Sequence, residues 1–202
     1  MKILKIYDNN INERHIAEAV EALKDGHIII YPTDSVYGLA VDALNRRAVE
    51  QLCRLKGLNP EKNLLSIVCA DLSQASDYVR IDNAAFSVVK NYLPGAYTFV
   101  LPASTRLPKI FKNRKTVGLR VPDNAVARHI AKALGNPLLT GSVDIDQDDP
   151  EASAEPENLA LTYSNDVALV IDSGRGGLVP TTLVDLTDPS EPEVIREGIA
   201  EF

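Results

Sequence analysis

Short apolar segments alternate with amphipathic segments along the 202-residue chain, and this alternation constrains the fold more than any other feature. Apolar residues recur at helical spacing after Asn12, Asn45, Asp82 and Asp123, whose side chains suit the position that precedes a helix. Runs typical of strands occupy residues 27–32, 63–70, 97–103, 116–122, 137–142, 167–172, 181–186 and 193–197. Because helices and strands interleave without a repeat or a long linker, we predict a single layered α/β domain over residues 1–202.

Composition narrows the class of protein. The apolar content of 45% and the charged content of 24% are typical of a soluble globular chain. Cys53 and Cys69 have neither metal-ligand spacing nor the density of a disulfide framework, so we expect buried, reduced thiols. No segment approaches the roughly 20 apolar residues of a membrane span, and the N-terminal run is too short for a signal peptide. We therefore expect a cytoplasmic protein with no membrane partner.

The charges are separated along the chain. The net charge of -7 argues against nonspecific binding of nucleic acid by the whole surface. Residues 106–120 nevertheless hold six Lys or Arg and no acid, whereas residues 144–157 hold seven acids and no base. The basic segment suits an anionic ligand, and the alternative is two solvated loops. Residues 145–158 lack periodicity and contain two prolines, so we predict the least ordered part of the chain there.

The acidic segment resembles a calcium-binding loop only in part. Asp144, Asp146, Asp148 and Glu155 occupy ligand positions of that template, but Asp149 replaces its glycine and a proline follows. The three histidines have no mutual spacing for a metal either. We predict no metal-binding cluster of side chains.

Polar residues gather at the ends of predicted strands. They are Thr33-Asp34-Ser35, Arg120, Thr140-Gly141-Ser142 and Thr181-Thr182. Open α/β sheets bind ligands at strand ends, and arginine with hydroxyl groups suits a carboxylate or a phosphate. Each group also has a structural alternative, such as a hydroxyl turn at Thr33 or a turn cap at Ser142. We predict that Thr33, Arg120, Thr140 and Thr181 converge on one cavity.

Other chemical motifs are weak. The glycine-rich stretch at residues 173–177, SGRGG, is not followed by a helical pattern, which favours a flexible turn over a phosphate-binding loop. No G-x-S-x-G, Cys-His or paired-carboxylate arrangement stands out, which argues against a nucleophilic hydrolase, and no catalytic side chain is assigned.

Several blocks in one order resemble a known family. They are YPTDSVYGL, LPGAYTFVL, TVGLRVPD, PLLTGS, PTTLVDL and VIREG, and together they span about residues 12–200. This pattern is similar to the YrdC/YciO family of threonylcarbamoyl-AMP synthases and their relatives. The resemblance implies one YrdC-like domain, classed as α/β or in some schemes α+β. Its expected form is a twisted mixed parallel and antiparallel sheet with helices around it and a concave ligand face.

The resemblance also implies substrates. Synthases of this family convert L-threonine, bicarbonate and ATP, with magnesium, to threonylcarbamoyl-AMP and pyrophosphate, for the modification of tRNA. By the matching positions, threonine would be held by Thr33, Arg120, Thr140 and Thr181. The nucleotide would be faced by Lys56, Ser142, Asp144 and Arg196. Asp34 and Tyr37 are expected to brace the turn.

Two positions depart from the family pattern. Leu58 replaces the arginine of a Lys-x-Arg pair, and Asp144 replaces the asparagine of Ser-x-Asn. We expect the carboxylate at 144 to repel the phosphates of ATP. Both departures are similar to the YciO branch and leave two alternatives. The first is an L-threonylcarbamoyladenylate synthase, a nucleotidyltransferase, of weak or altered activity. The second is a YciO-type double-stranded RNA-binding protein without synthase activity, which would use the basic segment on structured RNA or tRNA.

Overall fold

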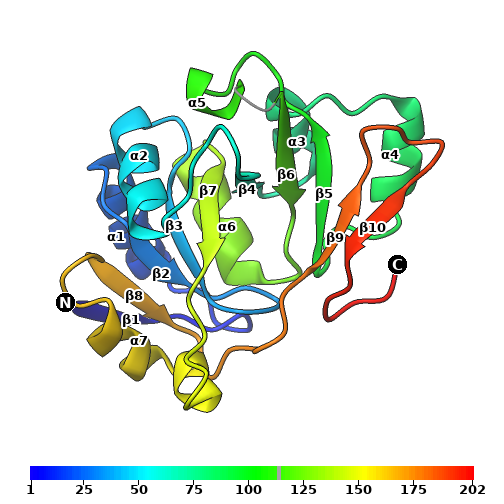
Figure 1. Cartoon of the computed structure of the whole chain (residues 1–202). Coiled ribbons are helices and arrows are strands. Elements are labelled where there is room, and N and C mark those ends of the chain that lie inside the picture. Colours follow the sequence, from blue (N-terminus) through cyan, green and yellow to red (C-terminus); the bar gives the residue numbers. More distant parts are fainter. Residues whose placement is uncertain (113–114) are drawn as a thin grey trace.

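In the computed structural model, residues 1–112 and 115–202 are described, apart from the side chain of Lys112. They form a ten-stranded sheet in the order β1-β8-β2-β3-β7-β4-β6-β5-β9-β10 (Figure 1). The strands are β1 (Lys2–Lys5), β2 (Ile29–Tyr31), β3 (Gly38–Asp42), β4 (Ser66–Val68), β5 (Tyr97–Pro102), β6 (Thr116–Arg120), β7 (Leu138–Ser142), β8 (Leu169–Asp172), β9 (Thr182–Asp185) and β10 (Glu193–Arg196).

The sheet is mixed and open. The pairs β1–β8, β2–β8, β4–β6 and β5–β9 are parallel, and the other neighbours are antiparallel. Its edges are β1 and β10, so the strands do not close into a barrel. The predicted single α/β fold with a mixed sheet is confirmed.

Helices cover both faces of the sheet. They are α1 (Glu13–Lys24), α2 (Arg46–Leu55), α3 (Leu72–Tyr78), α4 (Asn83–Val89), α5 (Lys109–Lys112), α6 (Ala125–Leu134), the 3-10 helix η1 (Pro150–Ala154) and α7 (Pro156–Thr162). No helix among the described residues is both long enough and apolar enough to cross a bilayer.

Two apolar cores lie on opposite sides of the sheet. Because successive strand residues point to opposite faces, Ile29 and Tyr31 pack with α1 and α6, whereas Ile28 and Ile30 belong to the core that contains residues of α2, α3, α4 and α7. The unbroken apolar run at 28–30 is therefore explained by burial on both faces.

Side-chain caps begin most of the predicted helices. Asn12, Asn45 and Asp82 accept hydrogen bonds from first-turn N–H groups of α1, α2 and α4, as predicted. The assignment of Asp123 as a cap is wrong by one residue. Asn124 caps α6 and accepts from the N–H three positions on at 2.9 Å, while the N–H of Asp123 is used elsewhere.

Residues 145–158 were predicted to be the least ordered part of the chain. This prediction is wrong, because the segment contains η1 and the start of α7. Asp149 accepts from the N–H of Ala152 at 3.2 Å, and Ser153 accepts from the N–H of Asp146 at 2.8 Å. Ser153, Ala154 and Pro156 are buried. The segment is ordered by the burial of these small residues. Because they do not form a periodic pattern of large apolar side chains, the sequence contains no signal of this order. Strands β1 and β3 and helices α3, α5 and α7 were also not predicted.

Candidate functional site

A polar cavity of about 270 Å³ lies over strands β7, β4, β6, β5 and β9. It occupies the face of the sheet that α1 and α6 cover elsewhere. Its lining consists of Leu64, Ser66, Thr98, Arg120, Thr140, Ser142, Thr181, Leu183 and Arg196.

Strict alternation along the strands builds this lining. Each cavity side chain on β4, β5, β6 and β7 is adjacent in sequence to a buried apolar residue of the opposite core, namely Ile67, Phe99, Leu119, Leu139 and Val143. Because side chains alternate between faces, the apolar neighbour fills the core while the polar one faces the cavity. Strand register then places Ser66 between Thr140 on β7 and Gly118 on β6.

Gly118 keeps the floor of the cavity open. A Cβ atom at this position would lie 2.4 Å from Ser66 Oγ and 2.9 Å from Thr98 Cγ2, closer than real contacts allow. A side chain here would displace the Ser66 hydroxyl on one side and the Thr98 methyl group on the other.

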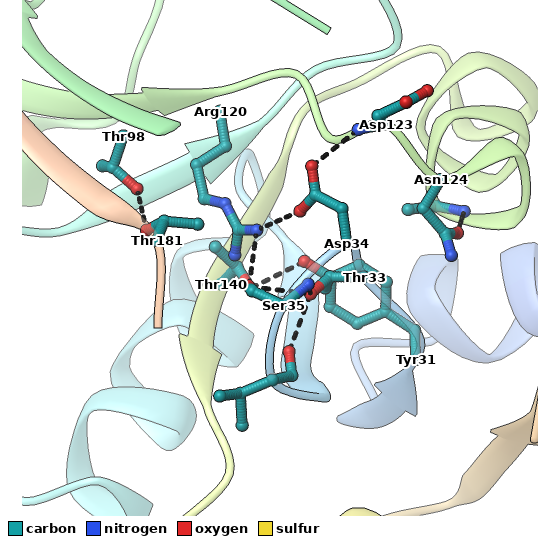
Figure 2. Close-up of polar contacts among 12 residues, drawn as sticks. Tyr31, Thr33, Asp34, Ser35, Thr98, Arg120, Asp123, Asn124, Thr140 and Thr181 are labelled. Carbon is teal, nitrogen blue, oxygen red and sulfur yellow. Dashed lines mark hydrogen bonds and ion pairs between the residues drawn. The ribbon is translucent and has the colours of Figure 1, made fainter. Parts of the chain in front are cut away.

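Arg120 is the charged group at the base of the cavity, with a side chain that is only 7% exposed. Its Nη2 donates to Asp34 Oδ1 at 2.9 Å and to Ser35 Oγ at 3.2 Å (Figure 2). The other Asp34 oxygen accepts from the N–H of Asp123 at 2.7 Å. Among the described residues, nothing accepts a hydrogen bond from the buried Nε of Arg120. A fixed guanidinium with an unused donor suits an anionic ligand.

Thr33 lies apart from this lining. Its Oγ1 donates to the carbonyl of Val36 at 2.7 Å and accepts from the N–H of Ser35 at 3.0 Å, which makes a hydroxyl turn. Thr33 lines a neighbouring cavity of about 200 Å³ and reaches Arg120 only through Ser35. Of the four residues predicted to hold an amino acid, the structure brings Arg120, Thr140 and Thr181 into one cavity.

Thr140 is oriented from beneath by Tyr31. The two hydroxyl groups are 2.7 Å apart in the buried region below the cavity (Figure 2). Burial raises the pKa of Tyr31, so the phenol stays neutral and able to share its proton with Thr140. Gly38 makes room for this contact, since a Cβ there would lie 2.5 Å from the Tyr31 ring.

Thr181 is fixed on the other side of the cavity. Its hydroxyl is 2.8 Å from that of Thr98, and its carbonyl accepts from Arg196 Nη2 at 2.9 Å. Arg196 and Ser142, both predicted to face a nucleotide, are members of the same lining.

Lys56 and Asp144 are joined in an ion pair beside the cavity. The Lys56 side chain is 13% exposed and packs along Gly141, whereas Asp144 is 76% exposed. Asp144 also accepts from the Tyr163 hydroxyl at 3.3 Å. The expectation of an uncompensated carboxylate at 144 is therefore corrected, because Lys56 neutralises it. Because Lys56 is paired with Asp144, the amine that was expected to face the nucleotide already has an anionic partner.

Leu58 faces the core. Helix α2 ends in a Schellman motif, in which Gly57 has φ of +61° and the N–H of Leu58 bonds to the carbonyl of Cys53 at 2.8 Å. Leu58 is the apolar residue that follows such a cap, and it packs against the core. This packing gives Leu58 a structural role in place of the missing arginine.

The glycine-rich segment 173–177 supports the turn that precedes β3. The Tyr37 hydroxyl donates to the carbonyl of Gly174 at 2.7 Å, and the N–H of Gly177 bonds to the carbonyl of Ser35 at 2.9 Å. A Cβ at Gly176 would lie 2.5 Å from the Tyr37 ring. Packing between two loops explains Gly176 and Gly177, whereas Gly174 adopts a positive φ of +88°. Tyr37 and Asp34 brace the turn, as expected.

A second cavity, of about 400 Å³, lies at the opposite ends of β5 and β6 from Arg120. Arg80, Ser104, Thr105 and Lys115 are part of its lining. Arg106 of the basic segment pairs with Asp77. Arg114 and the side chain of Lys112 lie outside the described residues. Among the described residues, no group of three or more His, Cys, Asp or Glu is arranged to hold a metal.

The fold is an open-sheet α/β domain, and it carries a small polar cavity with a buried arginine at its base. The family described as "Telomere recombination", which groups Sua5, YciO and YrdC, matches residues 21–198. The chain belongs to this Sua5/YciO/YrdC family.

Three relatives illustrate its place there. The uncharacterized protein YciO of Escherichia coli is 38% identical over 198 residues, which cover 97% of this chain and 95% of that protein. The crystal structure of E. coli YciO matches with a TM-score of 0.90 over 100% of this chain and 98% of that one. The threonylcarbamoyl-AMP synthase of Bacillus subtilis is 29% identical over 93% of this chain and 54% of its own length. Sua5 of P. abyssi, solved in complex with L-threonine, matches with a TM-score of 0.84 and 26% identity over 98% of this chain and 58% of that one.

Sequence reasoning missed several residues of the site. Ser66 and Thr98 line the cavity, Ser35 contacts Arg120, Tyr31 orients Thr140, and Tyr163 contacts Asp144. The available signal for the first two was a single hydroxyl residue next to fully buried apolar ones in a strand. That pattern indicates a polar position within an otherwise buried strand.

Proposed function

We propose that this protein binds an amino acid, L-threonine, in the cavity at Arg120, together with ATP as its magnesium complex. In this proposal the protein is a threonylcarbamoyl-AMP synthase of weak or altered activity. The observation that carries the proposal is the buried Arg120 guanidinium, which Asp34 fixes beside a row of hydroxyl groups that line the cavity. A volume of about 270 Å³ is slightly below the range of about 300–1,000 Å³ that is usual for ligand sites, which favours a small ligand.

The threonine side of the site has suitable chemistry. A carboxylate accepts paired hydrogen bonds from a guanidinium, and Thr140 and Thr181 supply short directional contacts for the remaining polar groups. The L-threonine complex of the related Sua5 supports this choice of ligand.

The nucleotide side of the site is weaker. Ser142 and Arg196 line the cavity, but Arg196 already donates to a backbone carbonyl and Lys56 is paired with Asp144. Fewer uncommitted donors remain for a triphosphate than the family pattern provides. We therefore propose weak binding of ATP.

The proposed chemistry needs no side-chain nucleophile. The amine of threonine first bonds to the carbon of bicarbonate, with loss of water, to give the carbamate. An oxygen of this carbamate then attacks the α-phosphorus of ATP, and pyrophosphate leaves. The protein's part is to hold the two substrates together and to neutralise developing charge.

Calorimetry with L-threonine tests the amino-acid site. Thr140→Val and Thr181→Val keep the side-chain shape and remove one hydroxyl each, so each is expected to weaken binding about 5- to 10-fold. Thr105→Val, in the other cavity, is the matched control and is expected to bind as the wild type does. Equal affinities for all four proteins would contradict the placement of the ligand.

One observation favours the alternative, a double-stranded RNA-binding protein without synthase activity. Arg80 and Lys115 line a separate cavity, and no ion pair to an acidic residue is found for either within the described parts of the chain. Two such cations suit phosphates of a structured RNA.

A further inference from the structure

Segment 196–202 lies against the beginning of β9 (Figure 1). Its first residue, Arg196, is part of the lining of the polar cavity. The N–H of Ile199 bonds to the carbonyl of Pro180 at 2.9 Å. Thr182 Oγ1 accepts from the N–H of Gly198 at 3.0 Å and donates to the carbonyl of Ala200. These bonds tie the segment to the residues that carry Thr181.

The approach of the two backbones is close at Gly198. A Cβ atom there would lie 2.3 Å from the carbonyl oxygen of Pro180 and 2.4 Å from the backbone nitrogen of Thr182. Only a residue without a side chain fits, so the segment is in direct contact with the strand.

Phe202 anchors the end of the segment. Its ring centroid is 4.7 Å from that of Tyr92 and 6.1 Å from that of Phe99, within the range of favourable aromatic pairs. The Tyr97 hydroxyl donates to the carbonyl of Glu201. The Phe202 ring is therefore packed against the aromatic part of the core, and Glu201 is bonded there through its carbonyl.

The segment reaches the cavity through its first residue. Arg196 Nη2 donates to the carbonyl of Thr181 at 2.9 Å, and the Thr181 hydroxyl is 2.8 Å from that of Thr98. Arg196, Thr181 and Thr98 are all part of the cavity lining. Arg196 belongs to segment 196–202 and bonds to Thr181, so the positions of both residues depend on this segment, which is anchored at the Phe202 ring.

We propose that Phe202 is a positioning residue for the ligand site: its ring anchors segment 196–202, which holds Arg196 and Thr181 in the geometry that binds ligand. The identity of the ligand, L-threonine, rests on the proposed function. The anchoring of Thr181 and Thr182 does not.

The test compares Phe202→Ala with Phe202→Tyr, which keeps the ring, and with Phe86→Ala, which removes an exposed ring on α4. L-threonine affinity is measured by calorimetry, and amide hydrogen exchange is measured without ligand at Thr182 and Ile199. Phe202→Ala is expected to weaken binding about 3- to 10-fold, the scale of the aromatic contacts it loses, and to accelerate exchange at both amides. Phe202→Tyr and Phe86→Ala are expected to match the wild type in both measurements.

Each other outcome is decisive. Unchanged exchange in Phe202→Ala would overturn the anchoring, and faster exchange with unchanged affinity would overturn the role in ligand binding. If wild-type protein does not bind L-threonine, the proposed function fails. Exchange at Thr182 then tests the anchoring alone: faster exchange in Phe202→Ala supports the anchoring, and unchanged exchange refutes it.

Discussion

Replacing Asp144 by asparagine tests the nucleotide side of the site, because Asp144 is the residue that pairs with Lys56. A carboxylate about 6 Å from a phosphate oxygen costs about 3 kcal/mol at an effective dielectric near 20 and less than about 1 kcal/mol in water. Since Asp144 is 76% exposed, the lower value is appropriate. Asp144→Asn also releases Lys56, whose nearly buried amine then gains a phosphate partner.

The combined effect of Asp144→Asn is expected to lower the dissociation constant of ATP about 5- to 20-fold. Adding Leu58→Arg supplies a second cation and is expected to tighten ATP binding further than either single change does. The arginine displaces a core contact at the end of α2, so it is expected to cost about 1–2 kcal/mol of unfolding free energy, or about 2–8 °C in Tm.

The assay is calorimetry with ATP at fixed free magnesium, together with threonine-dependent release of pyrophosphate. Asp148→Asn is the matched control, since it removes an exposed charge from the same segment without releasing Lys56. A folded double variant that binds ATP no better than the wild type would refute the assignment of Lys56 and Asp144 to a triphosphate site. If Asp148→Asn increases the affinity for ATP as much as Asp144→Asn does, the effect comes from the lower negative charge of the segment and not from the release of Lys56.

Two further predictions concern the floor of the cavity and the basic segment. Gly118→Ala is expected to abolish detectable binding of L-threonine in calorimetry, since its Cβ would lie 2.4 Å from Ser66 Oγ; a folded variant with full affinity would contradict the position of the floor. If the RNA alternative holds, affinity for a short duplex falls steeply with salt, measured by fluorescence anisotropy at two ionic strengths, because phosphate contacts release counterions. The same affinity is expected to fall on neutralising Lys112, Arg114 and Lys115. A signal that is absent at low salt or independent of salt excludes RNA as a direct partner.

Local sequence patterns predicted the elements that depend on neighbouring residues. The caps at Asn12, Asn45 and Asp82 and the amphipathic helices after them are confirmed, because capping and helical periodicity act within a few residues. The elements that were missed, such as β3 and η1, are short and have no periodic pattern of their own. They form because the residues around them supply hydrogen bonds and burial.

For the site, the sequence by itself determined the residue types and the family, and the tertiary structure decided which side chains meet. The sequence blocks identified Arg120, Thr140 and Thr181, and sheet register was required to bring them to one cavity. The pairing of Lys56 with Asp144, 88 positions apart, and the inward packing of Leu58 changed how two substitutions are understood. A chain specifies local conformation through adjacent residues, but the charge left for a ligand depends on contacts between distant segments, which exist only in the folded protein.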